Sequence, residues 1–135
     1  MSGEASFVAT DAYVGVVLAR PMATVDEAHA LHREIARRLA AATLTRVLLD
    51  YRAVGAHTDE VRECMWAWAE QAPLDPHAPI EAIAAVVTGE LTRVRLNMTA
   101  LARRVPMRAF ANEVDAVKWL VTPNTRRTTR IIHRV

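Results

Sequence analysis

The chain has 135 residues, of which 52% are hydrophobic and 24% charged, which is enough apolar material for one globular domain. Its net charge is only +2, and its single cysteine, Cys64, has no partner for an intrachain disulfide. These properties argue against a largely disordered chain, a disulfide-stabilised secreted domain and a strongly basic nucleic-acid binder. No span approaches the roughly 20 apolar residues of a membrane-crossing helix, so we expect a soluble cytoplasmic protein.

Two short β-type runs, SFVAT and YVGVVLA, open the chain and are close enough to pair as a hairpin. The segment at 23–43 then changes to helical periodicity, and Thr24 followed by Glu27 has the spacing of a capping box. His29 and His32 lie three residues apart on this helix, a spacing that suits two metal ligands. Because His32 falls on the apolar stripe, a partly buried, hydrogen-bonded histidine is the preferred interpretation.

RVLLDY, at 46–51, is an apolar run of strand length, and VRECMWAWAEQA, at 61–72, has the period of a second helix. Thr58 stands where the N-cap of this helix belongs, and Asp59 follows in its first turn. The three prolines of PLDPHAP end the helix.

IEAIAAVVTG, at 80–89, is apolar without polar alternation, which is typical of a strand covered on both faces of a parallel sheet. LTRVRLNMTALARRV, at 91–105, predicts a third helix whose inward stripe includes Leu91, Met98 and Leu101. MRAFA and NEVDAVKWLV, at 107–121, predict a fifth strand and a final helix capped by Asn112.

The predicted order is ββαβαβαβα, which indicates an α/β fold with about five strands in a mixed, mostly parallel sheet flanked by four helices. We expect the first strand to be antiparallel at an edge. Residues 1–121 are predicted to form a single domain. The basic tail at 122–135 either adds a strand or is disordered.

Three segments, VLLDYRAV, IAAVVTG and MRAFANEVDAVKWL, resemble the SpoIIAA-like branch of the STAS and SEC14-related α/β domains. That branch shows a strand ending in a carboxylate, a buried valine-rich strand and a closing pattern of Arg, Phe, an acidic stretch, Ala and Trp-Leu. Here the closing pattern consists of Arg108, Phe110, Glu113, Asp115, Ala116, Trp119 and Leu120. The resemblance covers residues 6–121 in element order and implies the same fold.

Anti-sigma-factor antagonists of this fold carry a phosphorylatable serine at the start of the helix after the central strand, where it switches partner binding. The matching turn here, VGAHTDEV, has no serine, and its nearest hydroxyl is that of Thr58. Asp50, His57, Thr58 and Asp59 are therefore the candidate regulatory or ligand-binding residues. Thr58 is either a phosphoacceptor or a plain N-cap. Asp50 either orients a ligand or holds the turn through backbone N–H groups.

Trp66 lies on the side of its helix opposite the apolar stripe, beside Arg62, which predicts an exposed interface anchor. The alternative is that PLDPHAP folds over it. Leu96 similarly leaves the stripe of the third helix, beside the basic Arg93. The candidate interface residues are therefore Trp66, Arg62, Leu96 and Arg93. The acidic second helix and the basic third helix could pair within the chain or across a two-fold interface, but a solvated basic face is the preferred interpretation.

No catalytic constellation and no cofactor motif is recognisable, so no cofactor is expected. We predict a non-enzymatic regulatory or protein-interaction domain of a bacterial protein, acting as a homodimer with a regulatory protein partner and without specific nucleic-acid binding. The alternative is a carrier of a small apolar molecule or lipid. Its pocket would lie between the second and third helices and be lined by Cys64, Met65, Trp68, Met98 and Leu101.

Overall fold

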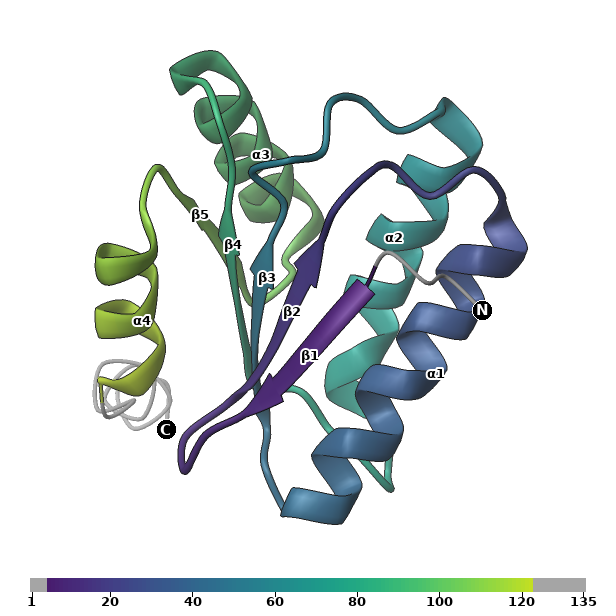
Figure 1. The fold of residues 1–135 in the computed structure, drawn as a ribbon, viewed down its shortest axis with the longest axis vertical. Coiled ribbons are helices and arrows are strands. Elements are labelled where there is room, and N and C mark those ends of the chain that lie inside the picture. The colour runs from purple at the N-terminus through teal and green to yellow at the C-terminus, as the bar shows by residue number, and fades with distance from the viewer. Residues whose placement is uncertain (1–4, 123–135) are drawn as a thin grey trace.

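Five strands form one sheet in the order β1-β2-β3-β4-β5, so strands that follow one another in the chain are also neighbours in space (Figure 1). The computed structural model describes residues 5–122, and the predicted tail lies outside this range except for Thr122. The strands are β1 (Ala5–Ala9), β2 (Val14–Leu18), β3 (Arg46–Asp50), β4 (Ala82–Val86) and β5 (Met107–Phe110). The helices are α1 (Val25–Ala42), α2 (Asp59–Gln71), α3 (Glu90–Arg103) and α4 (Glu113–Val121), and a 3-10 turn, η1, spans Ala72–Leu74.

β1 pairs antiparallel with β2, and all other neighbouring strands are parallel. The predicted element order and α/β class are therefore confirmed, including the antiparallel edge strand. Every residue of β4 is buried, which explains why its sequence shows no polar alternation.

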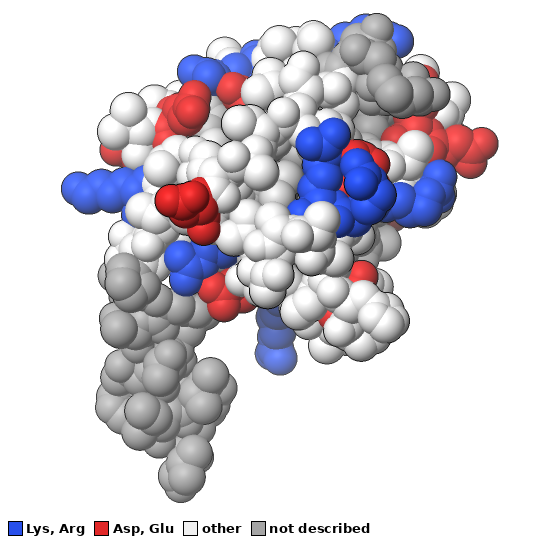
Figure 2. Space-filling model, turned by 60° about the horizontal axis from the view of Figure 1, so that its bottom comes forward, with Lys and Arg blue, Asp and Glu red and all other residues white. Residues whose placement is uncertain are grey.

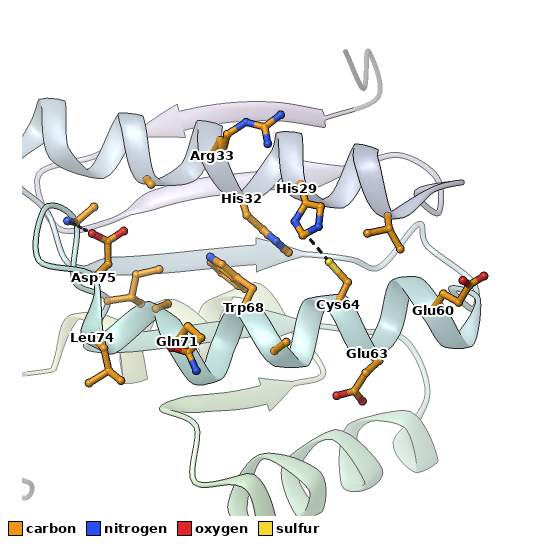
Figure 3. Close-up of a pocket in the computed structure, with 16 residues that line it drawn as sticks. His29, His32, Arg33, Glu60, Glu63, Cys64, Trp68, Gln71, Leu74 and Asp75 are labelled. Carbon is orange, nitrogen blue, oxygen red and sulfur yellow. Dashed lines mark hydrogen bonds between the residues drawn. The ribbon is translucent and has the colours of Figure 1, made fainter.

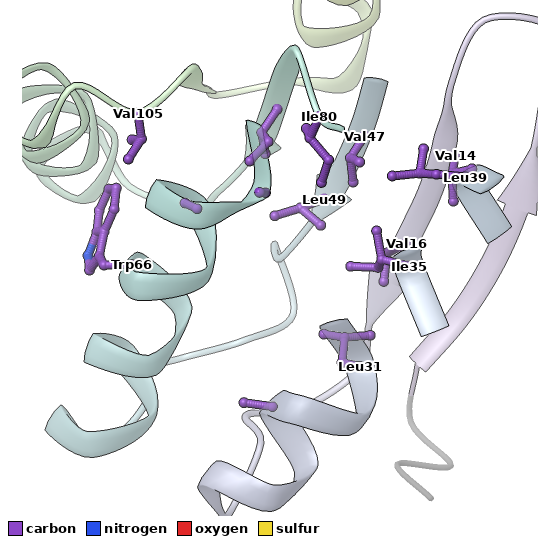
Figure 4. Packing of buried hydrophobic residues seen from close by; sticks show 14 of the residues in the cluster. Val14, Val16, Leu31, Ile35, Leu39, Val47, Leu49, Trp66, Ile80 and Val105 are labelled. Carbon is purple, nitrogen blue, oxygen red and sulfur yellow. The ribbon is translucent and has the colours of Figure 1, made fainter. Parts of the chain in front are cut away.

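Three helices cover one face of the sheet, and α4 covers the other (Figure 1). The larger core lies under α1 and α2 and joins Leu31 and Ile35 of α1 to Val16 and Leu49 of the sheet (Figure 4). Ala100 of α3 belongs to this same core. The smaller core lies under α4 and consists of Leu48, Ala82, Ala84, Val86, Ala116 and Leu120.

The start of α1 follows its sequence signal. The backbone N–H of Glu27 donates to Thr24 Oγ1 at 3.1 Å, and the carboxylate of Glu27 accepts from the backbone N–H of Ala23 at 2.8 Å. The predicted capping box is thus present, with its second bond made one residue before the N-cap.

The orientation of α3 differs from the prediction. Leu91, Met98 and Leu101 were expected to face inward, but they are 61%, 66% and 81% exposed. Asn97 instead faces the edge strand β5, where its side chain donates to the backbone oxygen of Ala109 at 3.2 Å and accepts from the backbone N–H of Ala109 at 2.7 Å. An edge strand leaves such backbone groups without a ladder partner, and the amide of Asn97 satisfies both of them.

Two substitutions in α3 test this orientation. Asn97→Ala leaves the part-buried backbone groups of Ala109 unpaired, and we expect it to lower the free energy of unfolding by about 1–3 kcal/mol. Leu101→Ala removes an exposed side chain, and we expect a change within about 0.5 kcal/mol. Urea unfolding measures both. A large loss for Leu101→Ala together with a negligible loss for Asn97→Ala would show that α3 buries its apolar stripe after all.

Candidate functional site

The junction between β3 and α2 contains the four turn residues singled out in the sequence. Asp50 is 9% exposed and accepts from the backbone N–H of Arg52 at 3.2 Å and from its guanidinium at 2.7 Å. The Arg52 guanidinium holds the pKa of Asp50 below its usual value, although burial opposes this effect. Arg52 also contacts Glu113 at the start of α4, at 3.5 Å. Asp50 therefore makes the contacts of a turn-holding residue, and its role toward a ligand stays a prediction.

Thr58 is the N-cap of α2, as predicted, because its Oγ1 accepts from the backbone N–H of Val61 at 3.3 Å. Asp59 forms a surface ion pair with Arg62, one turn further along the helix. The ring of His57 meets Tyr51 edge-on at 6.2 Å, and burial together with the charge of Arg62 lowers its pKa. The junction is thus held mainly by contacts within itself.

A hollow of about 1040 Å³ runs between α1 and α2 and is called here the α1–α2 groove (Figure 3). His29 and His32 line it from α1, and Cys64 and Trp68 line it from α2. The rings of His32 and Trp68 are stacked with their centroids 4.4 Å apart and their planes within 5°. The Sγ of Cys64 lies 3.9 Å from Nδ1 of His29. The groove therefore brings together two imidazoles, one thiol and an aromatic wall.

His32 is the most unusual residue of the groove. It is 7% exposed, and its Nε2 is buried without a hydrogen-bond partner among the described residues. Burial, with a smaller contribution from His29, lowers the pKa of His32 to about 3, so the ring is neutral at neutral pH. The predicted burial is confirmed, but the expected hydrogen bond is missing at Nε2. An unpaired buried polar atom of this kind costs about 1–3 kcal/mol and calls for an explanation.

The five residues predicted to line a pocket between the second and third helices do not line one pocket. Cys64 and Trp68 line the groove on the other flank of α2, against α1. Met65 packs partly buried against the main core. Met98 and Leu101 are exposed to solvent. The prediction failed because it assumed that α3 turns its apolar stripe toward α2.

The prediction that Trp66 faces solvent is also wrong. Trp66 is 9% exposed and points toward Val105, with the guanidinium of Arg103 5.8 Å from its ring centre (Figure 4). Leu96, expected outside the core, is partly buried against it. The physical reason is that α2 has a helix on each flank, so the side opposite Cys64 and Trp68 is also covered.

Arg103 of α3 links the two helices by ion pairs with Glu63 at 2.7 Å and Glu70 at 2.8 Å on α2. Of the two helix pairings considered, the one within the chain therefore occurs, and the preferred interpretation of a solvated basic face is wrong for Arg103. Arg62 and Arg93, proposed as interface residues, form ion pairs with Asp59 and Glu90 of their own helices. On the face seen in Figure 2, basic and acidic side chains are interspersed among uncharged areas rather than separated by sign.

The outer side of α3 carries the largest group of exposed apolar side chains on one helix of the described chain. Leu91, Met98 and Leu101 follow one another at intervals of seven and three residues, which places them on one side of the helix. We call these three residues the α3 stripe. Arg95 and Arg104 are exposed beside it. The apolar periodicity of α3 is the one sequence signal for this surface, and the sequence analysis assigned that periodicity to a side facing the core.

Two solved structures resemble the fold of this chain. An uncharacterized protein with a SpoIIAA-like fold from Shewanella loihica superposes with a TM-score of 0.60 at 13% identity, over 86% of this chain and 91% of that one. An anti-sigma factor antagonist from Mycobacterium paratuberculosis superposes with a TM-score of 0.57 at 18% identity, over 86% of this chain and 92% of that one. The chain has a SpoIIAA-like fold. The SpoIIAA-like resemblance drawn from the sequence is thereby confirmed at the level of fold.

No protein-family model matches the chain, and no curated protein matches its sequence. Among residues 5–122, none of the SpoIIAA-like domain's helices has the length and hydropathy needed to cross a bilayer.

The buried His32 predicts a specific pH dependence of the metal-free protein. Between pH 6.5 and about 3 the unfolded chain binds a proton at this position and the folded chain does not, so the free energy of unfolding falls as the pH is lowered. The slope from this one group is up to about 1.4 kcal/mol per pH unit.

Urea unfolding in the presence of a chelator at pH 7, 6 and 5, on the native protein and on His32→Leu, measures this slope. We expect the stability of His32→Leu to fall less steeply, because the other titrating groups are shared by both proteins. Parallel curves for the two proteins would contradict a buried neutral His32.

Proposed function

We propose that this SpoIIAA-like protein is a non-enzymatic regulatory or protein-interaction domain that binds a partner protein through the α3 stripe. The observation that carries the proposal is the exposure of Leu91, Met98 and Leu101, at 61%, 66% and 81%, on one side of a single helix. Exposed apolar side chains gathered on one surface are typical of interaction sites, whereas scattered ones are not.

The energetics favour binding at this surface. Burying a Leu or Met side chain contributes about 1.5–3 kcal/mol, and the α3 stripe offers three such side chains. The inner side of α3 is also anchored, because Asn97 bonds to β5 and Arg103 pairs with α2. Little ordering of the helix is therefore needed when a partner binds, which lowers the entropic cost.

The charges beside the stripe indicate the chemistry of the partner. Arg95 and Arg104 are exposed, and neither has an ion pair with an acidic residue of the described chain. Unpaired cations at the rim of an apolar patch favour a partner with complementary negative charge. We therefore propose a protein partner whose surface combines apolar and acidic side chains.

The similarity to the Mycobacterium paratuberculosis protein supports a protein partner, since that protein is named for antagonism of an anti-sigma factor. The contacts of Asp50 with Arg52 support a non-enzymatic role, because the carboxylate is already occupied by the turn. A cytoplasmic location remains part of the proposal.

A homodimer through Trp66 and Leu96 is not favoured, because both side chains are covered within the chain. A carrier pocket between α2 and α3 is not favoured either, because Met98 and Leu101 face solvent.

Photo-crosslinking in the producing cells tests the proposed surface. A photoreactive amino acid replaces Met98 in one variant and Val114 of α4, which is 76% exposed, in a control variant. We expect one adduct with a different protein from position 98 and no such adduct from position 114. Mass spectrometry of the adduct identifies the partner.

The affinity for the identified partner then completes the test. Met98→Glu removes an apolar contact and places a negative charge opposite an acidic partner, so we expect at least about a tenfold weaker complex, or 1.4 kcal/mol. Val114→Glu is the matched control and should bind like the native protein, with both variants melting at the native temperature. An adduct of two identical chains, equal adducts from both positions, or an unaltered affinity of Met98→Glu would overturn the proposal.

A further inference from the structure

We propose that His29, His32 and Cys64 form a binding site for a thiophilic divalent cation, best matched by Zn²⁺, in the α1–α2 groove. This site is separate from the α3 stripe and does not depend on the proposed partner. One ligand atom from each of the three side chains lies within 4.8 Å of the others. Imidazole nitrogens with a cysteine thiolate are among the ligand sets that Zn²⁺ prefers.

The geometry is close to that of a bound site. Zinc bonds of about 2.0–2.3 Å in a tetrahedron hold the ligand atoms roughly 3.3–3.6 Å apart. The 3.9 Å between Cys64 Sγ and His29 Nδ1 is near this range, and a separation of up to 4.8 Å needs only a small rotation of a side chain. Cys64 is half-buried and His29 exposed, so an ion can reach them from the groove.

His32 supplies an independent observation that points to a ligand. Its side chain is 7% exposed, its Nε2 has no hydrogen-bond partner among the described residues, and its ring extends into the groove beside Trp68 (Figure 3). A buried imidazole in a structural role normally donates and accepts hydrogen bonds. A metal ion takes up a ring nitrogen that the protein itself leaves without a partner. The 4.4 Å stack with Trp68 restrains the plane of the ring, as a supporting contact around a metal ligand does.

The elements that supply the ligands give the site a structural consequence. His29 and His32 are one turn apart on α1, and Cys64 comes from α2, so a shared ion connects the two helices directly. Three protein ligands leave a fourth position of a tetrahedral ion open toward the groove. The ion is therefore expected to be exchangeable and to stabilise the folded state when it is bound.

Cobalt substitution tests the ligand set. Co²⁺ is added to the reduced protein. The visible absorption typical of a tetrahedral ion, and a near-ultraviolet band from the thiolate, should both saturate at one Co²⁺ per protein chain. Cys64→Ser should lose the thiolate band, and His32→Leu should lose the tetrahedral spectrum. Titration with Zn²⁺ against a chromophoric chelator should show at least a tenfold weaker affinity for each variant.

His77→Ala is the matched control, because His77 is exposed in the loop after η1 and is no part of the groove. It should bind Zn²⁺ like the native protein, and Zn²⁺ should raise the melting temperature of both but not that of Cys64→Ser. Circular dichroism of the metal-free variants checks that they are folded. Unchanged affinity in Cys64→Ser and His32→Leu, or no stoichiometric binding by the native protein, would overturn the site.

Discussion

The structure depends on the central position of α2, which has α1 on one flank and α3 on the other above the same face of the sheet. A helix in this position buries two sides rather than one. Its α1 side stacks Trp68 on His32, and its α3 side places Trp66 under Arg103. The two candidate surfaces follow from this arrangement, because one flank forms the α1–α2 groove and the other determines how α3 is held.

α3 is fixed by polar contacts together with the packing of Ala100 and Leu96 against the core. Asn97 bonds to the backbone of the edge strand β5, and Arg103 pairs with Glu63 and Glu70 of α2. The sheet residues below, such as Ala85 and Ala109, are small and leave room for a close approach. Because Asn97, Arg103, Ala100 and Leu96 anchor the inner side, the α3 stripe is free to face outward. This division between an anchored inner side and an exposed apolar side is the basis of the proposed binding surface.

The sequence was sufficient to predict the element order, the antiparallel edge strand, the N-cap role of Thr58 and the SpoIIAA-like fold. The element order and the N-cap rest on local signals such as apolar runs and capping spacing, which the structure preserves, whereas the SpoIIAA-like fold was implied by the resemblance of three segments to that family. The directions of Trp66, Met98 and Leu101 were predicted wrongly, because helical periodicity identifies an apolar side but not the neighbour that it faces. The groove was missed as a unit because Cys64 is 35 residues from His29, and no short motif links the two helices.

The central claim is that α3 turns its apolar stripe to solvent. The most direct test compares the rates at which dilute hydrogen peroxide oxidises Met98 and Met22 in the free protein, measured by mass spectrometry. Met98 is 66% exposed, whereas Met22 is 3% exposed. The orientation of α3 described here predicts that Met98 is oxidised much faster than Met22 and becomes protected when the partner is bound. Equal, slow oxidation of the two methionines in the free protein would mean that the stripe is buried, and would contradict the account.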